Sequence, residues 1–181
     1  MLRPSIVIPL LVLPSLMACS TEPEPPPVTM DCSRFTFEEA PAIAGTHVST
    51  CFSPACGNGR NPPTAGPHCP TPLSCQNYDS EQPPCAWLHN LEHGHAVFLY
   101  DCADGCPNEV AKLEEARQEA RVGSNGVRRA LITPASGLPH RIAAILWRRA
   151  YLTDSADPEA LRCLLLLQDQ DAPEPGLDCA R

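Results

Sequence analysis

The chain has 181 residues, with 13 lysines and arginines against 21 aspartates and glutamates, and a formal net charge of −8 at pH 7. Such a surface repels nucleic-acid phosphates and anionic headgroups, and no basic patch in the sequence offsets it. We therefore expect no nucleic-acid partner, and the length allows one domain with additional segments.

Residues 1–18 predict a lipoprotein signal peptide. Arg3 supplies a short positive region, and the apolar stretch from Ile6 to Met17 is shorter than the ~20 residues that span a bilayer as a helix. The run LMAC (16–19) resembles the lipobox of bacterial lipoproteins, which implies cleavage before Cys19 and lipidation of its sulfur. The alternative is an ordinary secretory signal with a chance cysteine. The lipoprotein interpretation predicts a lipid-anchored protein of the bacterial cell envelope that faces the periplasm or the exterior.

A proline-rich tether is expected over residues 19–30. The run STEPEPPPVT (20–29) has four prolines, two glutamates and no apolar pattern, which is typical of a semi-rigid polyproline linker. Residues 31–181 are then expected to form a single globular domain.

The cysteine content predicts disulfides. Of the eleven cysteines, lipidation of Cys19 leaves ten, and an exported protein uses such a density for disulfide bonds. A thiolate zinc site is disfavoured because no C-x₂-C spacing occurs. Sequence alone cannot assign the pairs, but spacing suggests several: Cys102 with Cys106, Cys51 with Cys56, Cys75 with Cys69 or Cys85, and Cys32 with Cys163 or Cys179.

The N-terminal half of the domain differs from the C-terminal half. Residues 31–82 are rich in Pro, Gly, Ser, Thr and Cys, which indicates loops pinned by disulfides. Residues 96–100 read as a strand, residues 102–107 as a turn, and residues 108–122 as a helix with an apolar stripe.

The remaining elements follow in the same order. Residues 127–133 predict a second strand and residues 141–152 a third. A last helix should begin near Pro158, capped by Asp154 or Ser155 and ended by Pro173 and Pro175. The order β-α-β-β-α after residue 95 predicts an α+β fold, in which two helices cover one face of a small, mainly antiparallel sheet.

Three histidines and a glutamate lie within HNLEHGH (89–95). In a helix opened by Pro84, residues 89, 92 and 93 share a face, with Gly94 just past its end. In an extended chain, residues 89, 91, 93 and 95 share a face instead. Both geometries place His89 and His93 on one side, and imidazole is a common ligand for zinc, copper, iron and nickel.

Further donors stand upstream. His68 ends the stiff run NPPTAGPH (61–68) and is a candidate third metal ligand, with His47 as a fourth. The spacing H-x-x-E-H also matches inverzincin proteases, in which Glu92 would be the general base for a zinc-bound water. That chemistry needs a supported helix and a distant third ligand. The competing interpretation makes the histidines structural members of a polar network.

These motifs resemble those of an uncharacterised bacterial family, the domain of unknown function 3105. The resemblance rests on PPTAGPH (62–68), HNLEHG (89–94), the strand 96–100, Thr133-Pro134 and Trp147, with His47-Val48 upstream. Members are typically exported or membrane-anchored. Ala65 replaces the serine of the family motif, and His95 lies outside the usual pattern.

The resemblance implies a shared polar set of four histidines and one carboxylate: His47, His68, His89, Glu92 and His93. We therefore expect a copper or zinc site in an extracytoplasmic domain, used in metal handling or sensing, with Glu92 as a ligand or as the partner that orients an imidazole. Two alternatives stay open. One is a zinc-dependent hydrolase with Glu92 as its base, and the other is an interaction module without metal.

Overall fold

The computed structural model describes residues 30–49, 51 and 56–180, so the predicted signal peptide, Cys19 and nearly all of the tether lie outside the described residues. In the described part, the elements in chain order are β1 (Glu38–Glu39), α1 (Pro84–Glu92), β2 (Ala96–Tyr100), α2 (Pro107–Glu119), β3 (Ala130–Pro134), β4 (Ile142–Leu146), β5 (Arg149–Thr153) and α3 (Pro158–Leu165). None of these helices is both long enough and apolar enough to span a bilayer.

The strands form one mixed sheet in the order β1-β5-β4-β2-β3. Strands β2 and β3 run parallel, with Ala96 opposite Ala130, and the other pairs are antiparallel. A parallel pair needs a long crossover, which α2 supplies. The predicted α+β fold with a mainly antiparallel sheet is confirmed.

The single strand predicted over residues 141–152 is wrong. The chain forms two strands there, β4 and β5, which pair from Ile142 opposite Thr153 to Leu146 opposite Arg149. The reversal occurs at Trp147-Arg148, where Arg148 has the left-handed φ of 67°. Neither residue is a usual turn former, so the apolar pattern gave no sign of the turn.

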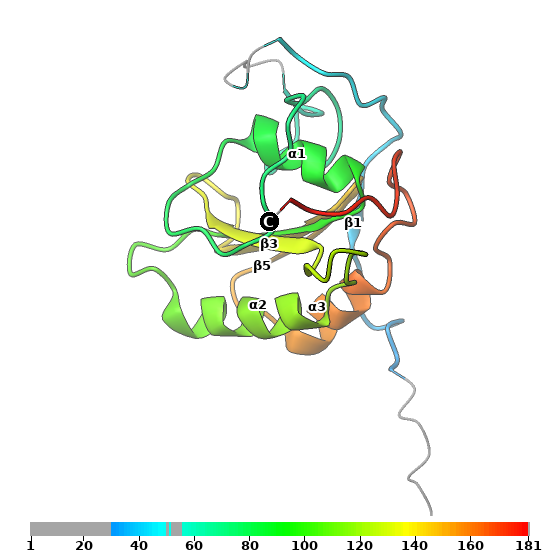
Figure 1. The fold of residues 1–181 in the computed structure, drawn as a ribbon. Helices are drawn as coiled ribbons and strands as arrows, with labels where there is room; N and C mark the ends of the chain where they lie inside the picture. The colour runs from blue at the N-terminus through cyan, green and yellow to red at the C-terminus, as the bar shows by residue number, and fades with distance from the viewer. Residues whose placement is uncertain (1–29, 50, 52–55, 181) are drawn as a thin grey trace, which may run out of the picture.

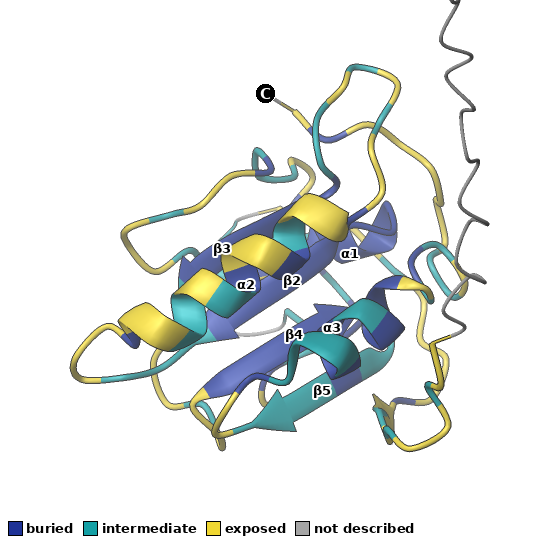
Figure 2. Ribbon diagram, turned by 90° about the horizontal axis from the view of Figure 1, so that it is seen from below, coloured by how far each residue is buried: buried dark blue, intermediate teal, exposed yellow. Residues whose placement is uncertain are grey.

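Helices cover both faces of the sheet (Figure 1). Helices α2 and α3 cover one face, as predicted (Figure 2). They enclose a core that includes Phe98, Leu113 and Leu161. Helix α1 covers the opposite face, where Trp87 and Leu91 pack on the sheet together with the loop-rich half. Each buried side chain of this size contributes about 1.5–3 kcal/mol.

The boundaries of α3 differ from the prediction. Its N-cap is Asp157, whose carboxylate accepts hydrogen bonds from the backbone N–H groups of Glu159 and Ala160. Pro158 at the first helical position makes the preceding residue the cap, which excludes Asp154 and Ser155. The helix ends at Leu165, well before Pro173. The turns that follow are closed by hydrogen bonds between residues three apart, such as that from the N–H of Leu167 to the Leu164 carbonyl.

The ten described cysteines form five disulfides: Cys32–Cys163, Cys51–Cys69, Cys56–Cys85, Cys75–Cys179 and Cys102–Cys106. The suggested pairs Cys102–Cys106 and Cys32–Cys163 are confirmed. The pairing of Cys51 with Cys56 and that of Cys75 with Cys69 or Cys85 are wrong. Short spacing misled because the loop containing Cys51 lies beside the segment containing Cys69, a contact that sequence distance does not indicate.

Candidate metal centre

Two loops far apart in sequence lie side by side and bring His47 to His68. The N–H of His68 donates to the Thr46 carbonyl at 2.9 Å, and the N–H of Val48 donates to the His68 carbonyl at 2.8 Å. This short parallel bridge fixes the two histidine backbones relative to each other. The proline-rich arm therefore folds back onto the upstream loop.

Arg148, in the turn between β4 and β5, holds both loops against the sheet. Its backbone N–H donates to the Thr64 carbonyl at 2.8 Å, and its carbonyl accepts from the N–H of Ala40 at 2.8 Å. Its Nε also donates to the Ala40 carbonyl at 2.9 Å. One residue thus connects the segment that leads to His68 with the segment that leads to His47.

Helix α1 supplies the other donors. The helix runs through residue 92, so His89, Glu92 and His93 lie at one end of it. Gly94 follows with φ of 78°, and a Cβ added there would stand 2.1 Å from an oxygen of Asp169. The helical alternative is therefore correct, and Gly94 ends the helix at a position that only glycine fits.

The Glu92 carboxylate is the centre of the cluster. Its Oε2 lies 2.8 Å from His68 Nε2, 3.9 Å from His47 Nε2 and 4.0 Å from His89 Nε2. The four donor atoms all lie within 4.8 Å of one another. The His68 side chain is fully buried, whereas that of His47 is 53% exposed, so the cluster has one solvent-facing side.

Backbone carbonyls fix the tautomers of two of these rings. His68 Nδ1 lies 2.8 Å from the Gly66 carbonyl, and His89 Nδ1 lies 2.7 Å from the Cys69 carbonyl. A carbonyl can only accept, so each Nδ1 carries the proton. In a neutral ring the Nε2 then bears a lone pair, and both lone pairs belong to the cluster around Glu92. This is the outer hydrogen bonding found on metal-ligating histidines.

The cluster brings hydrogen-bond acceptors together, namely the Glu92 carboxylate and imidazole lone pairs. Such a group is stable only with a positive charge among these atoms. Among the described residues, the ion-pair partners of Glu92 are histidines, with no lysine or arginine. Its carboxylate can be balanced by a proton on an imidazole or by a metal ion. Burial lowers the pKa of both His89 and His93, which keeps these rings neutral and able to coordinate at neutral pH.

A comparison with protein-family models matches residues 54–181 to DUF3105, described as a protein of unknown function. The chain belongs to the DUF3105 family. No curated protein and no solved structure matches it. In this DUF3105 protein, His68, His89, Glu92 and His93 lie inside the matched region, whereas His47 lies upstream of it.

His93, predicted as a ligand, lies at the edge of the cluster. Its Nε2 is 3.0 Å from His89 Nε2 and 3.4 Å from a carboxylate oxygen of Glu174. It groups with Glu92 and Glu174 rather than with His47 and His68. Sequence reasoning missed Glu174, which stands in a proline-rich tail without any motif. The one feature that could have indicated it is its acidic side chain, close to the end of the residues matched to the family.

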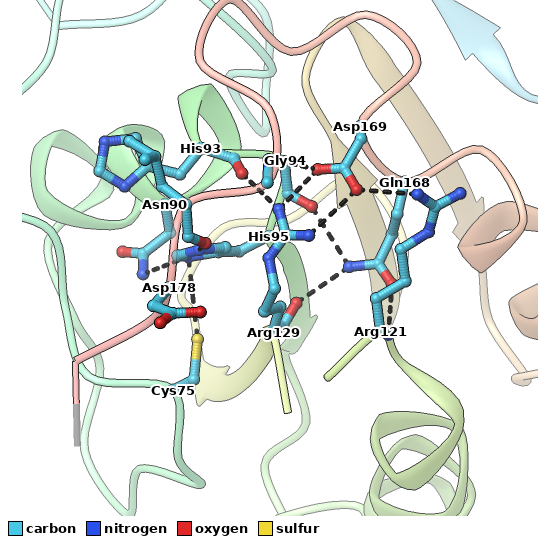
Figure 3. A network of polar contacts seen from close by, with 12 residues as sticks. Cys75, Asn90, His93, Gly94, His95, Arg121, Arg129, Gln168, Asp169 and Asp178 are labelled. Carbon is cyan, nitrogen blue, oxygen red and sulfur yellow. Dashed lines mark hydrogen bonds and ion pairs between the residues drawn. The ribbon is translucent and has the colours of Figure 1, made fainter. Parts of the chain in front are cut away.

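His95 belongs to a separate structural network (Figure 3). Its Nε2–H donates to the Leu177 carbonyl at 2.9 Å, and its Nδ1 accepts from the Asn90 amide at 3.2 Å. Cys75 and Cys179 surround the same ring, but their sulfurs form a disulfide. His95 is therefore a satisfied core histidine of the DUF3105 domain, and complete burial lowers its pKa to about 4.

The close packing of Gly45 against the site gives a testable prediction. A Cβ at position 45 would stand 2.0 Å from Oε1 of Glu92 and 3.0 Å from Cε1 of His68. Gly45→Ala should push the carboxylate away from the rings and weaken Zn²⁺ binding by about tenfold, or ~1.4 kcal/mol. The measurement is a competition titration with a chromophoric chelator. Unchanged affinity, with an unchanged unfolding transition, would contradict this account of the site.

Proposed function

We propose that this DUF3105 protein is a cell-envelope lipoprotein that binds Cu²⁺ or Zn²⁺ through His47, His68, His89 and Glu92. The observation that carries the proposal is the convergence of imidazole Nε2 atoms on one buried carboxylate, with two Nδ1 atoms held by carbonyls. Three nitrogens and one oxygen suit Cu²⁺ and Zn²⁺, whereas Mg²⁺ and Ca²⁺ prefer oxygen donors.

The cellular place of the protein is inferred from its cysteines. Five disulfides indicate an oxidising, extracytoplasmic compartment. The lipobox-like run LMAC (16–19) supports lipidation of Cys19, and the following prolines would hold the domain away from the membrane. The half-exposed His47 gives a buried ion a route for exchange, which supports metal handling or sensing rather than a permanent structural metal.

The deciding experiment is elemental analysis of the purified, disulfide-bonded protein, followed by titration of the metal-free form with Cu²⁺ and with Zn²⁺. The proposal expects stoichiometric, high-affinity binding that is lost on treatment with a strong chelator. A protein that binds neither ion tightly would instead be an interaction module with structural histidines, and the proposal would be wrong.

A zinc-dependent hydrolase is the second candidate. It is favoured by one observation: H-x-x-E-H lies at the end of a supported helix, with Glu92 beside a histidine cluster. Glu92→Gln separates the candidates. A general base can be lost without losing the ion, so the hydrolase expects metal binding to survive while a hydrolytic activity disappears. The binding proposal expects the affinity itself to fall, because Glu92 is then a ligand.

A further inference from the structure

We propose that a second divalent transition-metal ion binds between Glu92, His93 and Glu174, so that Glu92 bridges two ions. This inference rests on the proposed metal-binding function and extends the same site. Donor atoms of these three residues all lie within 4.8 Å of one another, and they form a group distinct from the one around His68.

The position of Glu174 is built into the fold. The C-terminal tail, drawn in red in Figure 1, crosses below α1. In this tail the backbone N–H of Glu174 donates to the Glu92 carbonyl at 3.0 Å. The bond from the N–H of Gly176, downstream of Glu174, to Asp169, upstream of it, is 3.0 Å long. Asp169 in turn pairs with Arg129 at 2.5 Å (Figure 3). Further along the tail, the Cys75–Cys179 disulfide attaches it to the core.

The two groups of donors adjoin each other and share Glu92. His89 Nε2 in the first group lies 3.0 Å from His93 Nε2 in the second. His93 Nε2 lies 3.4 Å from Oε2 of Glu174. In two-metal sites the ions stand ~3.5–4 Å apart, commonly sharing donors. An ion held by His93 and Glu174 would therefore adjoin an ion held by the group around His68, and Glu92 belongs to both groups.

The local charges favour cations here. His93 is buried and its Nδ1 has no hydrogen-bond partner in the described structure. The guanidinium of Arg129 donates to the His93 carbonyl at 2.6 Å and is paired with Asp169. Among the described residues, the ion-pair partner of Glu174 is His93 alone. The carboxylates of Glu92 and Glu174 therefore remain available to positive ions.

The two ions should differ in how readily they exchange. Each group has one half-exposed side chain, His47 in the first and Glu174 in the second, but the first group also contains the fully buried His68. The second group also offers one nitrogen and two carboxylates in place of three nitrogens and one carboxylate. We therefore expect the ion at Glu174 to bind more weakly and to leave first when chelator is added.

The test is the Zn²⁺ stoichiometry of the full chain, measured by calorimetric titration of the metal-free protein and by elemental analysis after gel filtration. Wild type should bind two equivalents, with the second at least about tenfold weaker. Glu174→Gln should bind one equivalent with the affinity of the tighter site unchanged. The control is Glu115→Gln, an exposed glutamate on α2 paired with Arg162, which should keep both equivalents.

Cu²⁺ provides an independent readout. Two Cu²⁺ ions that share a carboxylate couple magnetically, so the spin count of the loaded wild type should fall below its copper content. In Glu174→Gln the spin count should equal the copper content. A single equivalent in wild type, or a second equivalent that survives in Glu174→Gln, would overturn the inference and leave the first site standing. Absence of any tight binding would instead remove the proposed function itself.

Discussion

Replacing His68 with glutamine is expected to lower the affinity for Cu²⁺ or Zn²⁺ by at least about 100-fold, or ~2.7 kcal/mol. His68 is fully buried, its Nδ1 is held by the Gly66 carbonyl, and its Nε2 lies 2.8 Å from Glu92. Glutamine keeps a polar group there but offers no imidazole lone pair. The affinity would be measured by competition with a chelator of known strength.

The matched control for this variant is His140→Gln. His140 is a half-exposed histidine that pairs with Asp154 at 3.2 Å, away from the cluster. The His140→Gln variant should leave the affinity for Cu²⁺ or Zn²⁺ unchanged. Thermal unfolding of both metal-free variants checks that the fold is intact. Equal affinity in His68→Gln and wild type would exclude His68 as a ligand.

The metal-free protein is expected to lose about 3 kcal/mol of unfolding free energy between pH 6.5 and pH 4 because of His95. Burial lowers the pKa of His95 from 6.5 to about 4. Between these values the unfolded chain binds a proton that the folded chain does not, so the unfolding free energy falls as the pH falls. The loss begins below pH 6.5 and is complete near pH 4, at 1.36 kcal/mol for each unit of difference.

Urea unfolding of wild type and His95→Gln at pH 7 and pH 4 would measure this loss. The variant is expected to be less stable at pH 7, because it disturbs the bonds to Leu177 and Asn90. Its disadvantage should shrink by about 3 kcal/mol at pH 4. Burial also lowers the pKa of His89 and His93, but both proteins share these rings, so their effect cancels in the comparison. A constant difference between the two pH values would contradict the prediction.

Local chemistry explains which elements could be predicted from sequence. Helix α1 has a proline at its start and a glycine just past its end, and both are helix-boundary signals that are local in the sequence. The apolar strand at residues 96–100 is likewise a local pattern. The reversal at Arg148 was missed because the left-handed backbone is stabilised by the loops it bonds, which are distant in sequence.

The same distinction holds at the site. The prediction that His47, His68 and His89 would converge came from residue type and from the family motifs, and the fold brings these three rings together around Glu92. Whether they hold a metal stays a prediction. Glu174 could not be found, because its approach to His93 depends on the path of the tail and on a long-range disulfide. A contact of this kind, between residues distant in sequence, produces no periodic pattern in the amino-acid sequence.

The Cys32–Cys163 disulfide has a mechanical consequence. Cys32 precedes β1 in the chain, and its partner lies in α3, which packs on the sheet. Tension applied to the chain upstream would reach this covalent link before it reached β1, a strand of two residues at the sheet edge. The load would pass directly into α3, so β1 and the loop that contains His47 are spared from being peeled away.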